Sequence, residues 1–174
     1  MLKRQTRALV AIALGGVLMA TAPAAADTWN ERTQLTFDEA VEIPGRTLPP
    51  GTYVFRLGDA NTARHVLRVM SADENEVITT IQAIPMKRAQ ATNDIVLKFA
   101  PASGGEAPAL KGFFYPGRLY GHEFIYPEEQ ARHIADRTKT LVLSTEGSTD
   151  DLKSGTLHMV DAAGVRIPRH DDHQ

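Results

Sequence analysis

Residues 112–139, GFFYPGRLYGHEFIYPEEQARHIADRTK, contain the residue types best suited to chemistry in this chain. His122 and Glu123 are adjacent, and His133 follows eleven residues after His122. A zinc-protease helix needs two histidines four residues apart with a glutamate beside the first, so that both imidazoles meet one metal on one helical face. The longer spacing here, interrupted by Pro127, excludes that motif.

A non-helical metal site could still use His122, Glu123 and His133 with a water, because three protein ligands and an open position are typical of catalytic zinc. Adjacent residues on a strand point to opposite faces of a sheet, however, which separates His122 from Glu123. We therefore favour a polar alternation along a solvated strand, with no metal and no catalytic residue. A metal-dependent or hydrolytic enzyme that uses these three residues is the alternative.

Aromatic residues surround the His-Glu pair. If exposed, these rings could stack on sugars or dock a partner; if buried, they form core. Strand alternation turns about half of them inward, which favours core for the group. The group consists of Phe113, Phe114, Tyr115, Tyr120, Phe124 and Tyr126. For a binding function, the candidate residues that contact a ligand or partner are Tyr115, Tyr120, His122, Glu123 and Tyr126.

Other polar segments lack the spacing of known sites. The C-terminal RHDDHQ has metal-ligating residue types, but ordering an unstructured tail costs entropy. Residues 144–150, STEGSTD, lack the Gly-x-Ser-x-Gly elbow, and SGGEAP lacks the Lys-Ser/Thr of a phosphate-binding loop. His65 and His158 fall inside strand patterns. No cofactor is predicted.

Strands must position these residues, because apolar side chains recur with a period of two. This period appears in residues 35–43, 52–57, 65–71, 76–84 and 94–100, with polar or Gly/Pro-rich connections. Residues 44–51, PGRTLPPG, are expected to turn rather than to form a strand. After a flexible loop at 101–108, two further strands are predicted in ALKGFFY and HEFIY.

The C-terminal third contains one predicted helix, residues 127–139. Pro127 suits the first helical position, and acidic and basic residues lie at the favourable ends of the helix dipole. A strand at 141–145 and a hairpin around Ala162-Ala163-Gly164 follow. These patterns predict a mainly β fold, either an antiparallel β-sandwich or an open β-barrel, with one short helix near the C-terminal third.

The N-terminus has the pattern of a signal peptide, residues 1–26. Lys3, Arg4 and Arg7 precede the apolar run ALVAIALGGVLMA, and small residues lead to Ala26, after which we expect cleavage. The run is too short to span a membrane, so we expect no membrane insertion after cleavage. We predict a periplasmic or secreted protein with a single β-rich domain at 27–168 and a flexible tail at 169–174.

The net charge expected for the mature chain argues against two classes of partner. Removing three basic residues of the signal from 19 leaves 16 against 21 acidic residues, a net charge of −5. A nucleic acid or an anionic membrane rewards a clustered positive face, which the sequence does not show, so neither is predicted as a partner. The chain has no cysteine and therefore no disulfide.

Three segments resemble a group of small exported proteins of soil bacteria, usually labelled hypothetical. They are LTFDEAVEIPGRTLPPGTYVFRL, RHVLRVMSADENEVITTIQAIP and KGFFYPGRLYGHEFIYPEEQARHIA. The shared features are Trp-Asn near the N-terminus, the Leu-Pro-x-Gly-Thr-Tyr turn, and Tyr-Pro-Gly followed by Glu-Phe-x-Tyr-Pro. LPPGTYVFRL is also similar to a turn-and-strand phrase of secreted β-sandwich modules. The resemblance implies a β-sandwich-like framework and no established activity.

Together these observations predict an exported, non-enzymatic β-sandwich domain. Its partner would be an unidentified protein or small-molecule ligand in the cell envelope.

Overall fold

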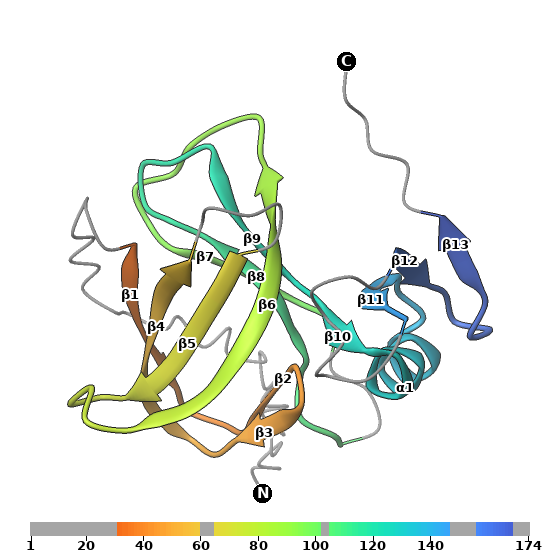
Figure 1. Cartoon of the computed structure of the whole chain (residues 1–174), viewed down its shortest axis with the longest axis horizontal. Helices are drawn as coiled ribbons and strands as arrows, with labels where there is room; N and C mark the ends of the chain where they lie inside the picture. Colours follow the sequence, from red (N-terminus) through yellow and green to blue (C-terminus); the bar gives the residue numbers. More distant parts are fainter. Residues whose placement is uncertain (1–30, 60–64, 102–104, 147–155, 169–174) are drawn as a thin grey trace, which may run out of the picture.

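The computed structural model describes residues 31–59, 65–101, 105–146 and 156–168. A seven-stranded antiparallel sheet curls into a half-barrel, beside which lie two smaller sheets and one short helix (Figure 1). The prediction of a mainly β fold with one short helix is confirmed. Of the two architectures left open by the sequence, the curled sheet corresponds to the open barrel.

The half-barrel has the strand order β1-β4-β5-β6-β9-β8-β7, and every neighbouring pair is antiparallel. Strands β1 and β7 are its edges, so the barrel has an open seam between them. The strands are β1 (Arg32–Phe37), β4 (Gly51–Asp59), β5 (His65–Ser71), β6 (Val77–Lys87), β7 (Val96–Phe99), β8 (Leu110–Phe114) and β9 (Tyr120–Phe124).

The inner face of the half-barrel carries the core, as the period of two predicts. Phe55 of β4 lies at its centre, with its ring centroid 6.1 Å from that of Phe113 and 6.2 Å from that of Phe124. These fully buried rings join β4 to β8 and β9, which lie far from it in the chain. Aliphatic residues that surround them include Leu35, Leu67, Val69, Ile81 and Leu110.

Two glycines allow β8 and β9 to approach closely. A Cβ on Gly112 would overlap the carbonyl oxygen of His122, and a Cβ on Gly121 would overlap that of Phe113. Glycine is therefore required at these positions, since a side chain would force the two strands apart. The close approach places the inward and outward side chains of β8 directly beside those of β9.

A short hairpin closes one end of the half-barrel. It consists of β2 (Val41–Ile43) and β3 (Arg46–Leu48), and it adds Val41, Ile43 and Leu48 to the core. The expectation that residues 44–51 contain no strand is wrong, because β3 lies between a turn at Pro44-Gly45, where Gly45 has φ 81°, and a bend at Pro50. The predicted strand at 35–43 is also divided, since residues 38–40 bend between β1 and β2.

The remaining elements form a second layer beside the half-barrel (Figure 1). Helix α1 (Glu128–Thr138) buries Ala131, Ile134 and Ala135, the apolar positions of the predicted helix. It packs against a four-stranded sheet. The strands of this sheet are β10 (Tyr126–Pro127), β11 (Val142–Thr145), β12 (Leu157–Val160) and β13 (Arg166–Pro168), the last two forming the predicted terminal hairpin.

No helix within the described ranges is both long and apolar enough to cross a membrane. The predicted signal peptide at 1–26 and the predicted tail at 169–174 lie outside the described residues.

Candidate functional site

The five residues proposed from the sequence occupy three separate places. Tyr115, Tyr120 and His122 meet at the inner face of the half-barrel. Glu123 lines a pocket on the opposite face of the same sheet. Tyr126 has no exposed surface, because it is packed between the half-barrel and helix α1.

His122 forms the centre of a buried polar cluster. Its exposed fraction is 1%, its Nε2 lies 3.1 Å from the Tyr115 hydroxyl, and its Nδ1 lies 3.1 Å from Nδ1 of His65. The expectation of a solvated strand face is therefore wrong for His122. The imidazole tolerates burial because partners on β5 and after β8 occupy both of its nitrogens.

Glu31 completes this arrangement from the start of β1. Its carboxylate accepts a hydrogen bond from the Tyr120 hydroxyl at 3.1 Å, and its backbone carbonyl accepts one from the Tyr115 hydroxyl at 3.3 Å. Its second carboxylate oxygen lies 3.6 Å from His122 Nε2. We call these five residues, Glu31, His65, Tyr115, Tyr120 and His122, the His122 cluster.

Burial sets the protonation states of the cluster. Burial and, to a smaller extent, the neighbouring His65 together lower the pKa of His122 to about 4. Burial also raises the pKa of Tyr115, as does the charge of Glu31. Near neutral pH the cluster thus contains a neutral imidazole and a neutral phenol, each already hydrogen-bonded. The approach of Glu31 to His122 is then not an ion pair.

The proposed metal ligands do not converge. His133 lies on the exposed side of α1, with its Nδ1 3.7 Å from the carboxylate of Glu106. His122 and Glu123 face opposite sides of β9, as strand alternation predicted. Within the described ranges, no group of three or more His, Cys, Asp or Glu side chains is placed to hold a metal ion.

The pocket that contains Glu123 lies where β7, β8, β9 and the end of β6 meet. Its charged residues are Lys87, Lys98, Lys111 and Glu123, and its volume is about 520 Å³. Its apolar residues are Met86, Leu97, Phe99 and Phe114. We call this site the lysine pocket.

Lys98 and Lys111 are close enough to influence each other. Burial lowers the pKa of Lys111, the charge of Lys98 lowers it further, and Glu123 opposes both effects. The Lys111 ammonium donates a hydrogen bond to the Leu141 carbonyl at 2.5 Å. Among the carboxylates of the described residues, none forms an ion pair with the three lysines of the pocket.

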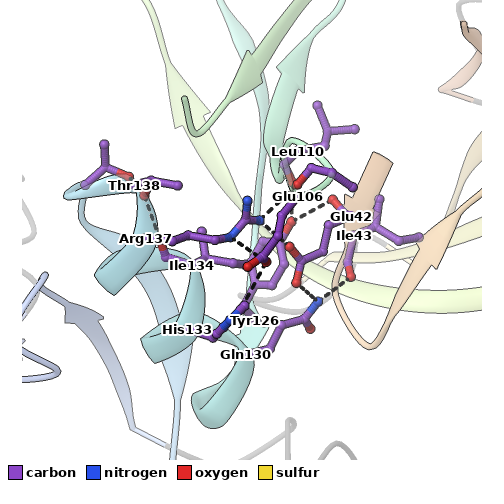
Figure 2. A network of polar contacts seen from close by, with 12 residues as sticks. Glu42, Ile43, Glu106, Leu110, Tyr126, Gln130, His133, Ile134, Arg137 and Thr138 are labelled. Atoms are coloured by element: carbon purple, nitrogen blue, oxygen red, sulfur yellow. Dashed lines mark hydrogen bonds and ion pairs between the residues drawn. The ribbon is translucent and has the colours of Figure 1, made fainter. Parts of the chain in front are cut away.

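A third polar group joins helix α1 to the half-barrel (Figure 2). Arg137, with 8% of its side chain exposed, pairs with Glu42 of β2 and donates to the Ala107 carbonyl at 3.0 Å. Gln130 donates to the Glu42 carboxylate at 2.8 Å. The Tyr126 hydroxyl contacts the carbonyls of Glu42 and Leu110, at 3.2 and 2.7 Å. We call this group the Arg137 network. It connects α1 to β2 and β8, and the role of Tyr126 in it is structural.

Sequence reasoning missed Glu31 and His65 in the cluster, and all three lysines of the pocket. The period of two does place His65 on the face of Leu67 and Val69, which was a usable signal for an inward histidine. Lys98 and Lys111 are single polar residues in apolar strands, a pattern equally typical of a solvated face. Only the pairing of β7 with β8 brings them together.

Comparison of the chain with models of protein families, with curated proteins and with solved structures finds no match.

Proposed function

We propose that the mature chain is an exported, non-enzymatic domain that binds a small-molecule ligand in the lysine pocket. The observation that carries this proposal is the convergence of four charged side chains around an open volume of about 520 Å³ that apolar side chains also line. Ligand sites are typically concave, mostly apolar, and have volumes of roughly 300 to 1,000 Å³ with a few polar groups that orient the ligand.

The His122 cluster supports the non-enzymatic part of the proposal. A catalytic base must reach a proton on the substrate, and a nucleophile must be accessible to it. Both nitrogens of His122 contact protein groups, and the Tyr115 hydroxyl contacts His122 and the Glu31 carbonyl. None of these residues lines the lysine pocket.

The export part of the proposal is supported by the basic, apolar and small-residue order of residues 1–26. N-terminal sequencing of the protein recovered from periplasmic and culture fractions tests it. We expect the mature chain to begin at Asp27. Recovery in the cytoplasm with residues 1–26 intact would contradict export and leave the binding site to be tested separately.

Methionine methyl groups offer a direct test of binding. The mature chain has three methionines, of which Met86 lines the pocket, whereas Met70 lies on β5 and Met159 on β12. With ¹³C-methyl methionine, we expect small molecules from a library of mixed charge to shift the Met86 signal in a saturable way. The Met70 and Met159 signals serve as internal controls.

The resonances are assigned with a Met86→Leu variant, which retains the volume and apolar character of the side chain. A library that leaves the Met86 signal in place, or that shifts all three signals equally, would contradict a ligand site in the lysine pocket.

A further inference from the structure

We propose that the ligand of the lysine pocket is an amphiphilic carboxylate, that is, one carboxylate group on an apolar body. This inference rests on the proposed function and names the class of ligand. The carboxylate would lie between Lys98 and Lys111, and the apolar body would lie along Leu97 and Phe99.

The charge of the pocket favours an anion. Three lysines face one glutamate, in a mature chain whose overall charge is negative. Lys111 is partly desolvated and has Lys98 as a like-charged neighbour, and among the described residues Glu123 and the Leu141 carbonyl compensate its charge. An anion beside these two ammonium groups would offset their mutual repulsion and the cost of burial.

The pairing of three strands locates the position for the carboxylate. Gly112 of β8 pairs with Lys98 of β7 on one side and with Glu123 of β9 on the other. Lys98 and Glu123 therefore flank Gly112, which contributes no side chain of its own because the His122 carbonyl lies where its Cβ would be. Lys111, the residue before Gly112, borders the same pocket.

The positive charge of the pocket comes from lysine rather than arginine, which favours a carboxylate ligand over a phosphate. A lysine ammonium acts as a point charge, whereas phosphate recognition commonly uses the bidentate guanidinium of arginine or backbone N–H groups. No arginine is among the described residues that line the pocket. Arg88 stacks on Phe114 at 4.9 Å, but its N–H groups are bonded to the Arg118 and Tyr115 carbonyls and to Thr92. Glu123 would repel a second negative charge.

The apolar walls continue beyond the lysines. Leu97 and Phe99 of β7 also line a second cleft of about 290 Å³ at the open seam of the half-barrel, together with Phe37 and Val41. Phe99 is 39% exposed and lines both clefts, so its ring offers apolar surface at the point where they meet. An apolar chain that starts at Lys98 can therefore pass over β7 and cover Phe99.

Four compounds separate charge from apolar area: decanoate, decanol, decyltrimethylammonium and acetate. Their binding is followed by the Met86 methyl signal and by isothermal titration calorimetry. We expect the Kd of decanoate to be about tenfold lower than that of decanol. We expect no saturable shift with acetate, which lacks the apolar body, or with the cation.

Two variants locate the carboxylate, and a third is their control. Lys98→Gln and Lys111→Gln should each reduce the preference for decanoate over decanol about tenfold. Lys139→Gln removes an exposed lysine that pairs with Asp136 on α1, and it should leave the preference unchanged. Lys98 is exposed, so its substitution keeps the test informative even if the Lys111 variant fails to fold.

The outcomes distinguish the two proposals. Equal binding of decanoate and decanol, or tighter binding of the cation, would overturn the assignment of an anion while the pocket remains a ligand site. A preference for decanoate that survives both lysine substitutions would overturn the position of the carboxylate. If neither these compounds nor any library member shifts the Met86 signal, the proposed function itself fails.

Discussion

The His122 cluster and the lysine pocket lie on opposite faces of the same two strands, β8 and β9. On the inner face, His122 and Tyr115 are bonded to each other and to neighbouring groups. On the outer face, Lys98, Lys111 and Glu123 surround an open volume without forming an ion pair among themselves. Polar groups that satisfy one another stabilise a fold, whereas charged side chains around an open volume stay solvated and accessible to other molecules.

The largest loss of stability is expected where β8 and β9 approach closely, because both faces of the sheet depend on that approach. Gly121→Ala should lower the free energy of unfolding by about 3 kcal/mol or more, because its Cβ would overlap the Phe113 carbonyl and force β8 from β9. Gly117→Ala is the control. Gly117 has φ 65° and no heavy atom within 4 Å of the added Cβ, so only backbone strain of about 1 kcal/mol applies. Urea denaturation that shows equal losses would contradict the close approach.

Protonation of His122 in acid should lower the free energy of unfolding. Because the pKa of His122 is about 4 in the folded protein and about 6.5 when unfolded, the unfolded state binds more protons between these values. Stability should therefore fall as the pH drops from about 6.5 to about 4, by a total on the order of 3 kcal/mol.

A His122→Gln variant isolates this contribution. Hydrogen bonds lower the pKa of several surface carboxyl groups, including Asp73 and Glu128, and these groups also lose stabilisation in acid. They are present in both proteins, so the difference between the two curves of stability against pH reports His122. Parallel curves for the two proteins would show that the imidazole is not buried in its neutral form.

Loss of the Tyr115 hydroxyl, at the centre of the His122 cluster, should reduce stability more than loss of the Tyr120 hydroxyl at its exposed edge. Tyr115→Phe leaves His122 Nε2 without its 3.1 Å partner, at a cost of roughly 1 to 2 kcal/mol. Tyr120→Phe is the matched change at the rim, where Tyr120 is 36% exposed and water can replace the lost bond to Glu31. Thermal unfolding should show a smaller loss for Tyr120→Phe, and the reverse order would contradict the cluster geometry.

The smallest change in stability is expected in the lysine pocket, and it should have the opposite sign to the changes in the His122 cluster. Lys111→Met removes a partly desolvated charge and retains a long side chain, so without ligand the protein should be unchanged or more stable by up to about 1 kcal/mol. The Leu141 carbonyl, freed from Lys111, belongs to an exposed residue and can bond water. A loss above about 1 kcal/mol in chemical denaturation would show that Lys111 is structural.

Local patterns were sufficient to predict most strands and the helix. The period of two separated His122 from Glu123, and these residues do lie on opposite faces of β9. Pro127 lies directly before the first residue of α1. These features depend on residues that are neighbours in the chain, which is why the sequence reveals them.

The candidate sites depend on pairings between distant segments. β6 pairs with β9 and β5 pairs with β6, which brings His65 to His122 across 57 residues of chain. Nothing in the spacing of the histidines indicates this strand order. The lysine pocket likewise requires β7 to pair with β8 with a register shift at Lys98/Phe99, and neither the partner nor the shift can be read from an alternating pattern.

The Arg137 network has a consequence for the order of folding. It joins Glu42 to Arg137 across 95 residues, so the contact that attaches β2 to α1 forms only when most of the chain is available. Contacts this distant slow folding, because the intervening chain must be ordered before they contribute. A fragment that ends before α1 would leave the Glu42 carboxylate without Gln130 and Arg137, so the attachment of the β2–β3 hairpin to α1 should be completed late in folding.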